Sequence, residues 1–127
     1  MEKEYKFEEY NSVGGRIIPK ITLGRSSGLG LSAGFAKKYE IQDVVGVKLF
    51  FDRVNYAIGL KLITKPEDGM LKIKLAPKQG GAYINAKAFL IKYDIKAEEV
   101  MGRYEPKEIK SEGGRMFVIE LKAKSNI

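Results

Sequence analysis

Lysine and arginine side chains are concentrated in two stretches of this chain, and neither stretch contains a carboxylate. Residues 10–39 and residues 69–93 each carry five basic residues and no Asp or Glu. In the rest of the chain acidic and basic residues nearly balance. Clustered ammonium and guanidinium groups without carboxylates are suited to bind a polyanion, because each can contact a phosphate. The sequence therefore predicts an anion-binding surface that draws on both stretches.

The candidate contacts lie on expected strands, in glycine-rich turns and near an expected helix start. Lys72 and Lys74 are two residues apart, so on one strand they would point to the same side of a sheet. Tyr83 and Phe50 are candidates for base stacking, which single-strand binding needs, although either ring could instead pack in the core. From the basic stretches we predict these nucleic-acid-binding residues: Lys20, Arg25, Lys72, Lys74, Lys78, Tyr83 and Lys87.

Catalytic chemistry has few candidate residues in this chain. There is no histidine and no cysteine, which removes the commonest acid–base group, the usual zinc ligands and any disulfide. The glycines at 24, 28 and 30 lack the Gly-Lys-Ser/Thr ending of a phosphate-binding loop. We therefore expect a protein that is not an enzyme and that needs no cofactor or metal.

Composition narrows the class of protein further. The 127 residues carry a formal net charge of +7, and no apolar run is long enough to span a bilayer. We expect a cytoplasmic protein with no membrane partner, and the abundance of Lys, Glu and Ile is typical of a thermophilic source. The length suits one domain, residues 1–127, with a charged N-terminal arm at residues 1–15.

A short motif occurs twice and predicts an internal repeat. Phe35, Lys38, Tyr39 and Ile41 recur with the same spacing as Phe89, Lys92, Tyr93 and Ile95. The motif itself is equally well explained as the buried stripe of a helix. We predict repeats at residues 16–63 and 70–122, with a turn-rich link between them.

Each repeat is expected to run strand–strand–helix–strand–strand. In the first, Ser32 is the expected N-cap of a helix ending near Tyr39, and residues 45–51 and 56–62 alternate as strands around a turn at 52–55. In the second, Leu71, Ile73 and Leu75 are expected to face inward and Asn85 to cap the helix. Further strands are expected at 101–105 and 117–121. The predicted fold is α+β: two tandem ββαββ repeats forming one compact antiparallel-sheet domain with two short helices.

Two stretches resemble the strand-into-helix junction of the PC4/Whirly group of single-stranded-DNA-binding proteins. Residues 28–35 and 81–89 each contain a glycine, a short apolar strand, a Ser or Asn cap and an aromatic residue in the helix. That group binds through basic, aromatic-bearing sheet surfaces. The resemblance implies a role in binding for Lys48, Lys61, Lys72, Lys74 and Tyr83.

The strand–helix–strand–strand order also resembles tandem swapped-hairpin proteins of the AbrB/MraZ type, which bind duplex DNA, typically as oligomers. We therefore expect a nucleic-acid-binding protein, with single-stranded DNA preferred over duplex, that forms a homodimer or higher oligomer. One alternative is a duplex-binding transcriptional regulator. The other is a structural or oligomerisation module, such as one from a virus or phage, whose basic face meets an acidic protein.

Overall fold

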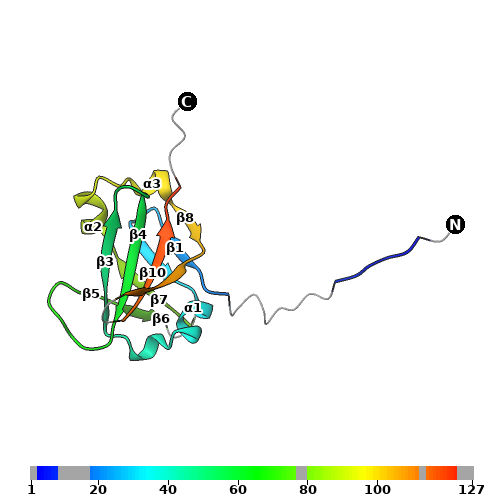
Figure 1. Cartoon of the computed structure of the whole chain (residues 1–127), viewed down its shortest axis with the longest axis horizontal. Helices are drawn as coiled ribbons and strands as arrows, with labels where there is room; N and C mark the ends of the chain where they lie inside the picture. Colours follow the sequence, from blue (N-terminus) through cyan, green and yellow to red (C-terminus); the bar gives the residue numbers. More distant parts are fainter. Residues whose placement is uncertain (1–2, 9–17, 77–79, 112–113, 123–127) are drawn as a thin grey trace.

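The chain folds as an α+β protein in which two five-stranded antiparallel sheets pack face to face (Figure 1). The computed structural model describes residues 3–8, 18–76, 80–111 and 114–122. Sheet A has the order β6-β7-β2-β1-β8 and sheet B the order β5-β3-β4-β10-β9. The strands are β1 (Ile21–Leu23), β2 (Gly28–Leu31), β3 (Gly46–Asp52), β4 (Ala57–Ile63), β5 (Leu71–Lys72), β6 (Lys74–Ala76), β7 (Gly81–Asn85), β8 (Gly102–Tyr104), β9 (Lys107–Ser111) and β10 (Gly114–Glu120).

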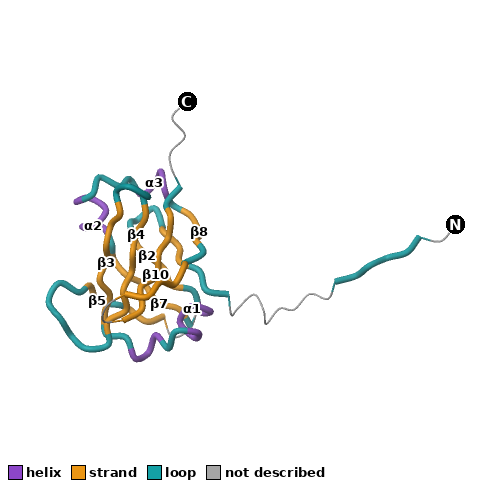
Figure 2. The backbone as a smooth tube through the Cα atoms, viewed as in Figure 1, coloured by secondary structure: helices purple, strands orange, loops and turns teal. Residues whose placement is uncertain are grey.

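Three chain segments pass from one sheet to the other: the one that contains α1 connects β2 to β3, and the other two are short. β5 belongs to sheet B and β6 to sheet A, with only Ile73 between them. Likewise β8 belongs to sheet A and β9 to sheet B, separated by Glu105 and Pro106. Figure 2 shows that strands make up most of the folded part of the chain and that the helices are short. The sheets are therefore joined at both edges of the sandwich.

The core lies between the two sheets. Every second residue of the central strands faces inward, as the period of a half-buried strand requires. Sheet A contributes Leu29 and Ile84, both fully buried, and sheet B contributes Leu60 and Phe117, at most 2% exposed. Burying one such side chain contributes about 1.5–3 kcal/mol. These contacts fix which face of each sheet remains for solvent.

Three short helices lie near the ends of the sandwich: α1 (Ala33–Lys38), α2 (Lys87–Lys92) and α3 (Ala97–Val100). α1 begins as predicted, because the Ser32 hydroxyl accepts a hydrogen bond from the Phe35 N–H at 3.1 Å. The same hydroxyl accepts from the Lys20 N–H at 2.9 Å, which ties the helix start to β1. A 3₁₀ helix (Ile41–Asp43) follows α1.

The repeated motif has the same geometry at both helix ends. The Phe35 and Tyr39 rings lie 4.9 Å apart, and the Phe89 and Tyr93 rings 5.0 Å apart. The next residues, Glu40 and Asp94, both adopt the left-handed conformation, with φ of 52° and 54°. The isoleucines that complete the motif, at 41 and 95, are buried. The motif therefore packs the helices and ends them, and it is not an exposed binding element.

Three details of the predicted elements are wrong. There are three α-helices in the described residues instead of two, because the charged segment 97–100 is helical. Asn85 is the last residue of β7 and Ala86 is the N-cap of α2, although the Asn85 side chain does accept from the Lys87 N–H. β9 was not predicted, because three of its five residues are charged. Leu75 is on the inward side of β6, opposite the buried Ala82, but it is half-exposed because its strand lies at the edge of sheet A.

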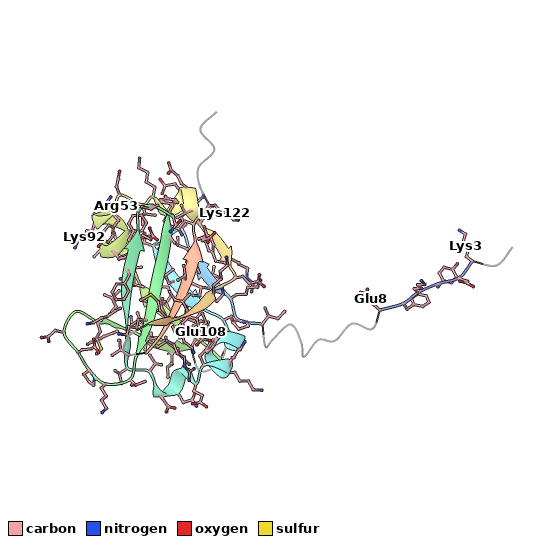
Figure 3. All side chains as sticks on the ribbon, in the orientation of Figure 1. Lys3, Glu8, Arg53, Lys92, Glu108 and Lys122 are labelled. Carbon is pink, nitrogen blue, oxygen red and sulfur yellow. The ribbon has the colours of Figure 1, made fainter. Side chains whose placement is uncertain are left out.

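The N-terminal arm is described at residues 3–8, where every residue is exposed and none is in a helix or strand. Figure 3 places Lys3 and Glu8 well away from the two sheets. The rest of the predicted arm lies outside the described residues. Within the part of the chain that the structure describes, no helix has both the length and the apolar character needed to cross a membrane.

Candidate nucleic-acid interface

Three of the predicted lysines line one depression at the edge of sheet A. Lys72, Lys74 and Lys87 surround a hollow of about 510 Å³, and all three are exposed. Among the described residues that line it there is no carboxylate; the others are Leu71, Asn85, Ala88 and Ile91. Three ammonium groups around one hollow form a local field that favours anions.

The lysines reach this depression from three different elements. Lys72 is in β5 of sheet B and Lys74 in β6 of sheet A, so the prediction that they share one strand is wrong. The break between the two strands lies at Ile73, where the chain passes between the sheets. Lys87 is the first residue of α2, and its N–H donates to Asn85 Oδ1 at 3.1 Å. The sheet crossing therefore brings the lysines together.

Tyr83 lies next to the lysine depression, on the outer face of sheet A. It is directly opposite Lys74 in the β6–β7 ladder and is 39% exposed. Its ring covers Gly28 of β2: a Cβ atom built on that glycine would lie 2.2 Å from the ring. Gly28 therefore leaves the space that the ring occupies, and the contact holds the ring against the sheet while part of it remains exposed.

Arg25 and Lys20 lie beyond opposite ends of β1 and do not line the lysine depression. Arg25 is exposed in the turn between β1 and β2, and this turn contacts the start of α2 through a hydrogen bond from the Ala86 N–H to the Ser27 carbonyl. Lys20 precedes β1, and its Nζ is 3.3 Å from a carboxylate oxygen of Glu105. Lys78 lies outside the described residues.

Lys48 and Lys61 are on the outer face of sheet B and do not line the lysine depression, although Lys72 of the same sheet does. They are directly opposite each other on β3 and β4. The Lys48 Nζ lies 2.6 Å from Glu67 Oε1, and the hydrogen bond from Lys48 lowers the pKa of Glu67 below its ordinary value. Phe50, 43% exposed, is on the same face. The predicted residues therefore do not all meet at one hollow, and the basic charge of Lys48 is partly offset by Glu67.

A residue that the sequence did not single out, Arg103 of β8, lines a second depression on the outer face of sheet A. This hollow of about 320 Å³ is also lined by Thr22, Gly30, Gly81 and Tyr83, among other small or apolar residues. Arg103 lies outside both basic stretches, in a segment where charges balance. Only the pairing of β8 with β1 places it on this face.

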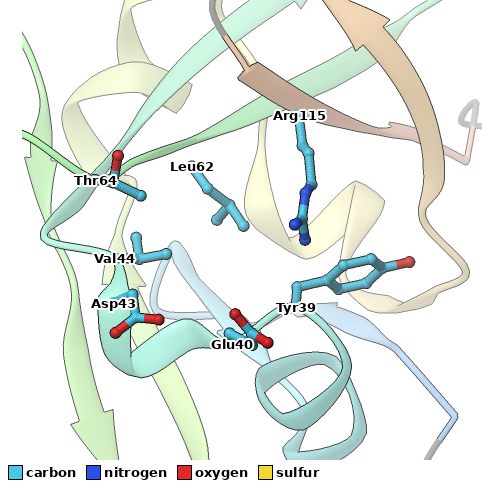
Figure 4. Close-up of a pocket in the computed structure, with 7 residues that line it drawn as sticks. All are labelled: Tyr39, Glu40, Asp43, Val44, Leu62, Thr64 and Arg115. Atoms are coloured by element: carbon cyan, nitrogen blue, oxygen red, sulfur yellow. The ribbon is translucent and has the colours of Figure 1, made fainter.

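A third hollow, of about 240 Å³, has a different character (Figure 4). Its lining contains Arg115 but also the carboxylates of Glu40 and Asp43. The Arg115 guanidinium lies 6.0 Å from the centre of the Tyr39 ring, so it also packs against an aromatic face. A mixed lining of this kind does not favour a polyanion, and we do not assign it to the interface.

Comparison of the chain with protein-family models, with curated proteins and with solved structures found no match. The resemblances to the PC4/Whirly group and to the AbrB/MraZ type therefore stay predictions. The described residues contain no group of three or more Asp or Glu side chains placed to hold a metal ion.

Proposed function

We propose that this protein binds nucleic acid without catalysing a reaction, and that it prefers single strands to duplex. The observation that carries the proposal is the lysine depression: Lys72, Lys74 and Lys87 line one hollow whose described lining has no carboxylate. Exposed lysines scattered over a surface are common and imply no ligand. Three that converge from β5, β6 and α2 on one hollow make a surface that suits phosphate groups.

The exposed ring beside this depression supports the preference for single strands. Tyr83 is held against Gly28 and lies opposite Lys74, so a base could stack on the ring while its phosphate contacts the lysine. In a duplex the bases are already stacked and paired, so an aromatic side chain on an open sheet cannot reach a base face. Stacking on one aromatic residue contributes about 1–3 kcal/mol per base.

The test is a titration of labelled oligo-dT and of a duplex of equal length at several salt concentrations. The variant Lys72→Glu plus Lys74→Glu should bind oligo-dT much more weakly, and its salt dependence should be shallower by about 0.7 in log–log slope for each phosphate that the variant no longer neutralises. The control is Lys96→Glu plus Lys110→Glu, which makes the same change in charge at two exposed residues that do not line the depression.

The control should bind like the wild-type protein, and both variants should keep the wild-type circular dichroism spectrum. If wild-type protein binds neither DNA at low salt, the proposed function is wrong. If the two double variants are equally weakened, net charge is responsible and the lysine depression is not the site. Tighter binding to the duplex than to oligo-dT would favour the duplex-binding alternative.

One observation favours a second candidate, an acidic protein partner. Ile91 lines the lysine depression and is 68% exposed. Apolar side chains beside lysines would suit an acidic peptide segment with its own apolar residues. Here Ile91→Ser would weaken partner binding while leaving the binding of oligo-dT unchanged, which separates the two candidates.

We also propose that the chain consists of two ββαββ units related by an approximate twofold axis. In sheet A, Gly30 pairs with Tyr83, and the flanking pairs are Leu29 with Ile84 and Leu31 with Ala82. Adding 53 to the residue numbers of β2 gives residues 81–84 of β7, and exchanging the two strands in this way leaves the same residues paired. The sequence suggests the same shift, because residues 31–33 resemble residues 84–86.

Sheet B supports the same relation. β4 and β10 each have seven residues, and Leu60 pairs with Phe117 at the middle of both strands. In each sheet a further strand of one unit pairs with the other unit: β8 pairs with β1 in sheet A, and β5 pairs with β3 in sheet B. Glu40 and Asp94, which follow the two helices, both adopt the left-handed backbone conformation, so the ends of the helices also correspond.

A further inference from the structure

Five side-chain positions form a straight row across the outer face of sheet A. Lys74 is opposite Tyr83, Tyr83 is opposite Gly30, Gly30 is opposite Thr22, and Thr22 is opposite Arg103. Residues directly opposite each other in adjacent strands point to the same face. The row therefore runs at right angles to the strands, with a basic residue at each end and an aromatic residue beside one of them.

The middle of this row is hollow because of its small residues. Gly30, Thr22 and Gly81 help to line the 320 Å³ depression between Tyr83 and Arg103. Gly81 cannot be replaced without strain, since a Cβ atom there would lie 2.4 Å from the carbonyl oxygen of Leu31. Gly30 differs, because a Cβ atom built on it would lie 3.8 Å from its nearest neighbour. A side chain there would therefore fit the fold but would fill the hollow.

The charges along the row also suit a polyanion. Among the residues that line this depression in the described structure there is no carboxylate. The nearest acidic residue along β8 is Glu105, and it is already paired with Lys20 at 3.3 Å. Arg103 is exposed, and the described residues provide no ion pair to it. Arg103 lines the end of this depression and also borders a neighbouring hollow whose lining includes Glu105 and Glu120.

We propose that the bound nucleic-acid strand crosses sheet A along this row, from the lysine depression over Tyr83 to Arg103. The inference rests on the proposed function and specifies its path. One base stacks on Tyr83, the backbone beyond it enters the glycine-lined hollow, and Arg103 contacts a later phosphate. Four steps between neighbouring strands span about 19 Å, so the path holds about four nucleotides, the lower end of site sizes on single-strand-binding domains.

An alternative explanation is purely structural. An exposed sheet face needs some covering, and Tyr83 over Gly28 would provide it without any ligand. That explanation assigns no role to Arg103 and predicts no effect of filling the hollow at Gly30. The two explanations therefore differ at residues that do not line the lysine depression.

The test measures the binding of oligo-dT of 2, 4, 6 and 12 nucleotides by fluorescence anisotropy at constant salt. For the wild-type protein, affinity should rise steeply up to about four nucleotides and only slightly beyond that length. Arg103→Glu should weaken the binding of the 12-mer about tenfold or more and lower its salt slope by about 0.7 or more. The matched control, Lys110→Glu on the exposed strand β9, should show neither effect.

Gly30→Val provides a second and independent measurement, because valine suits a strand and its Cβ has room at this position. It should fold with a normal melting curve and bind the 12-mer at least fivefold more weakly. The path is wrong if Arg103→Glu binds the 12-mer as tightly as Lys110→Glu does and Gly30→Val binds it like wild type. This conclusion requires that Lys72→Glu plus Lys74→Glu still abolishes binding. In that case the proposed function stands. If the wild-type protein binds no oligonucleotide, both proposals fail.

Discussion

Tyr83 depends on a neighbour that has no side chain. Its ring occupies the space above Gly28, where a Cβ atom would lie only 2.2 Å from two of the ring's atoms. A ring that is already held in place loses little conformational freedom when a base stacks on it. Phe50 offers a useful comparison, because it is similarly exposed, at 43%, but lies on sheet B beside the partly neutralised Lys48.

Replacing each aromatic residue by alanine should therefore have different effects on binding. Tyr83→Ala should weaken oligo-dT binding by about 1–3 kcal/mol, whereas Phe50→Ala should leave it unchanged. Tyr83→Phe keeps the ring and should bind nearly as well as wild type. Anisotropy titrations of the three variants, after their folding is verified by thermal melting, test this expectation. Equal losses for Tyr83→Ala and Phe50→Ala would contradict the assignment of stacking to sheet A.

At the scale of elements, the two strand-to-helix junctions have the same layout but different hydrogen bonds. The Ser32 hydroxyl accepts from two backbone N–H groups, those of Phe35 and Lys20. The side-chain oxygen of Asn85, Oδ1, accepts a hydrogen bond from the Lys87 N–H alone, and Asn85 is exposed. A part-buried acceptor with two donors costs more to remove than an exposed acceptor with one, because water can replace the latter.

Alanine substitutions at these junctions should show this difference. Ser32→Ala should lower the free energy of unfolding by about 1–2 kcal/mol, because it leaves two donors without their acceptor. Asn85→Ala should lower it by about 0.5 kcal/mol, the low end for a single hydrogen bond. Urea unfolding measured by circular dichroism tests the order of the two values. If Asn85→Ala proves the more destabilising, the junction at α2 is more important than its contacts indicate.

Elements that a short stretch of sequence specifies were predicted well. Elements that depend on contacts between distant parts of the chain were not. The α+β class, the Ser32 cap and the turn at 52–55 follow from hydrophobic period and capping residues, and the structure contains all three. β9 has no such period, since Lys107, Glu108 and Lys110 dominate it. The break at Ile73 has no local signal either, because the chain changes sheets there to pair with β3 on one side and β7 on the other.

The candidate site shows the same division. Charge counted along the sequence selected Lys72, Lys74 and Lys87 correctly as neighbours in one basic region. It could not show that Lys48 and Lys61 do not line this depression, because that depends on which strands pair. It also missed Arg103, whose local sequence is balanced in charge and which reaches the outer face of sheet A only through its pairing with β1.

At the scale of the whole molecule, the proposed twofold relation makes the two units interchangeable in principle. In sheet A the axis would pass through the pair of Gly30 and Tyr83, and in sheet B through the pair of Leu60 and Phe117. If both units were identical, a residue on the twofold axis would lie opposite the same residue of the other unit. A chain made of one unit repeated would therefore place glycine opposite glycine and leucine opposite leucine, without a steric conflict.

A chain that contains residues 18–69 twice should consequently fold as a monomer with the wild-type circular dichroism spectrum. Its stability should be lower, because Leu60 is smaller than the Phe117 that it would replace in the core. The control is a single copy of residues 18–69, which should be unfolded or dimeric. Size-exclusion chromatography and thermal melting test both chains. A double copy with no cooperative transition, beside a folded wild-type protein, would contradict the twofold relation.

The pairing of strands between the two halves also has a consequence for how the protein is made. β2 has β1 on one edge but receives β7 on the other, and β4 likewise has β3 but receives β10. While only the first seventy residues have left the ribosome, both of these strands have an open edge and an apolar face that nothing covers. Until β10 is synthesised, the nascent chain therefore resembles half of an interface, and it is then that we expect it to depend most on chaperones.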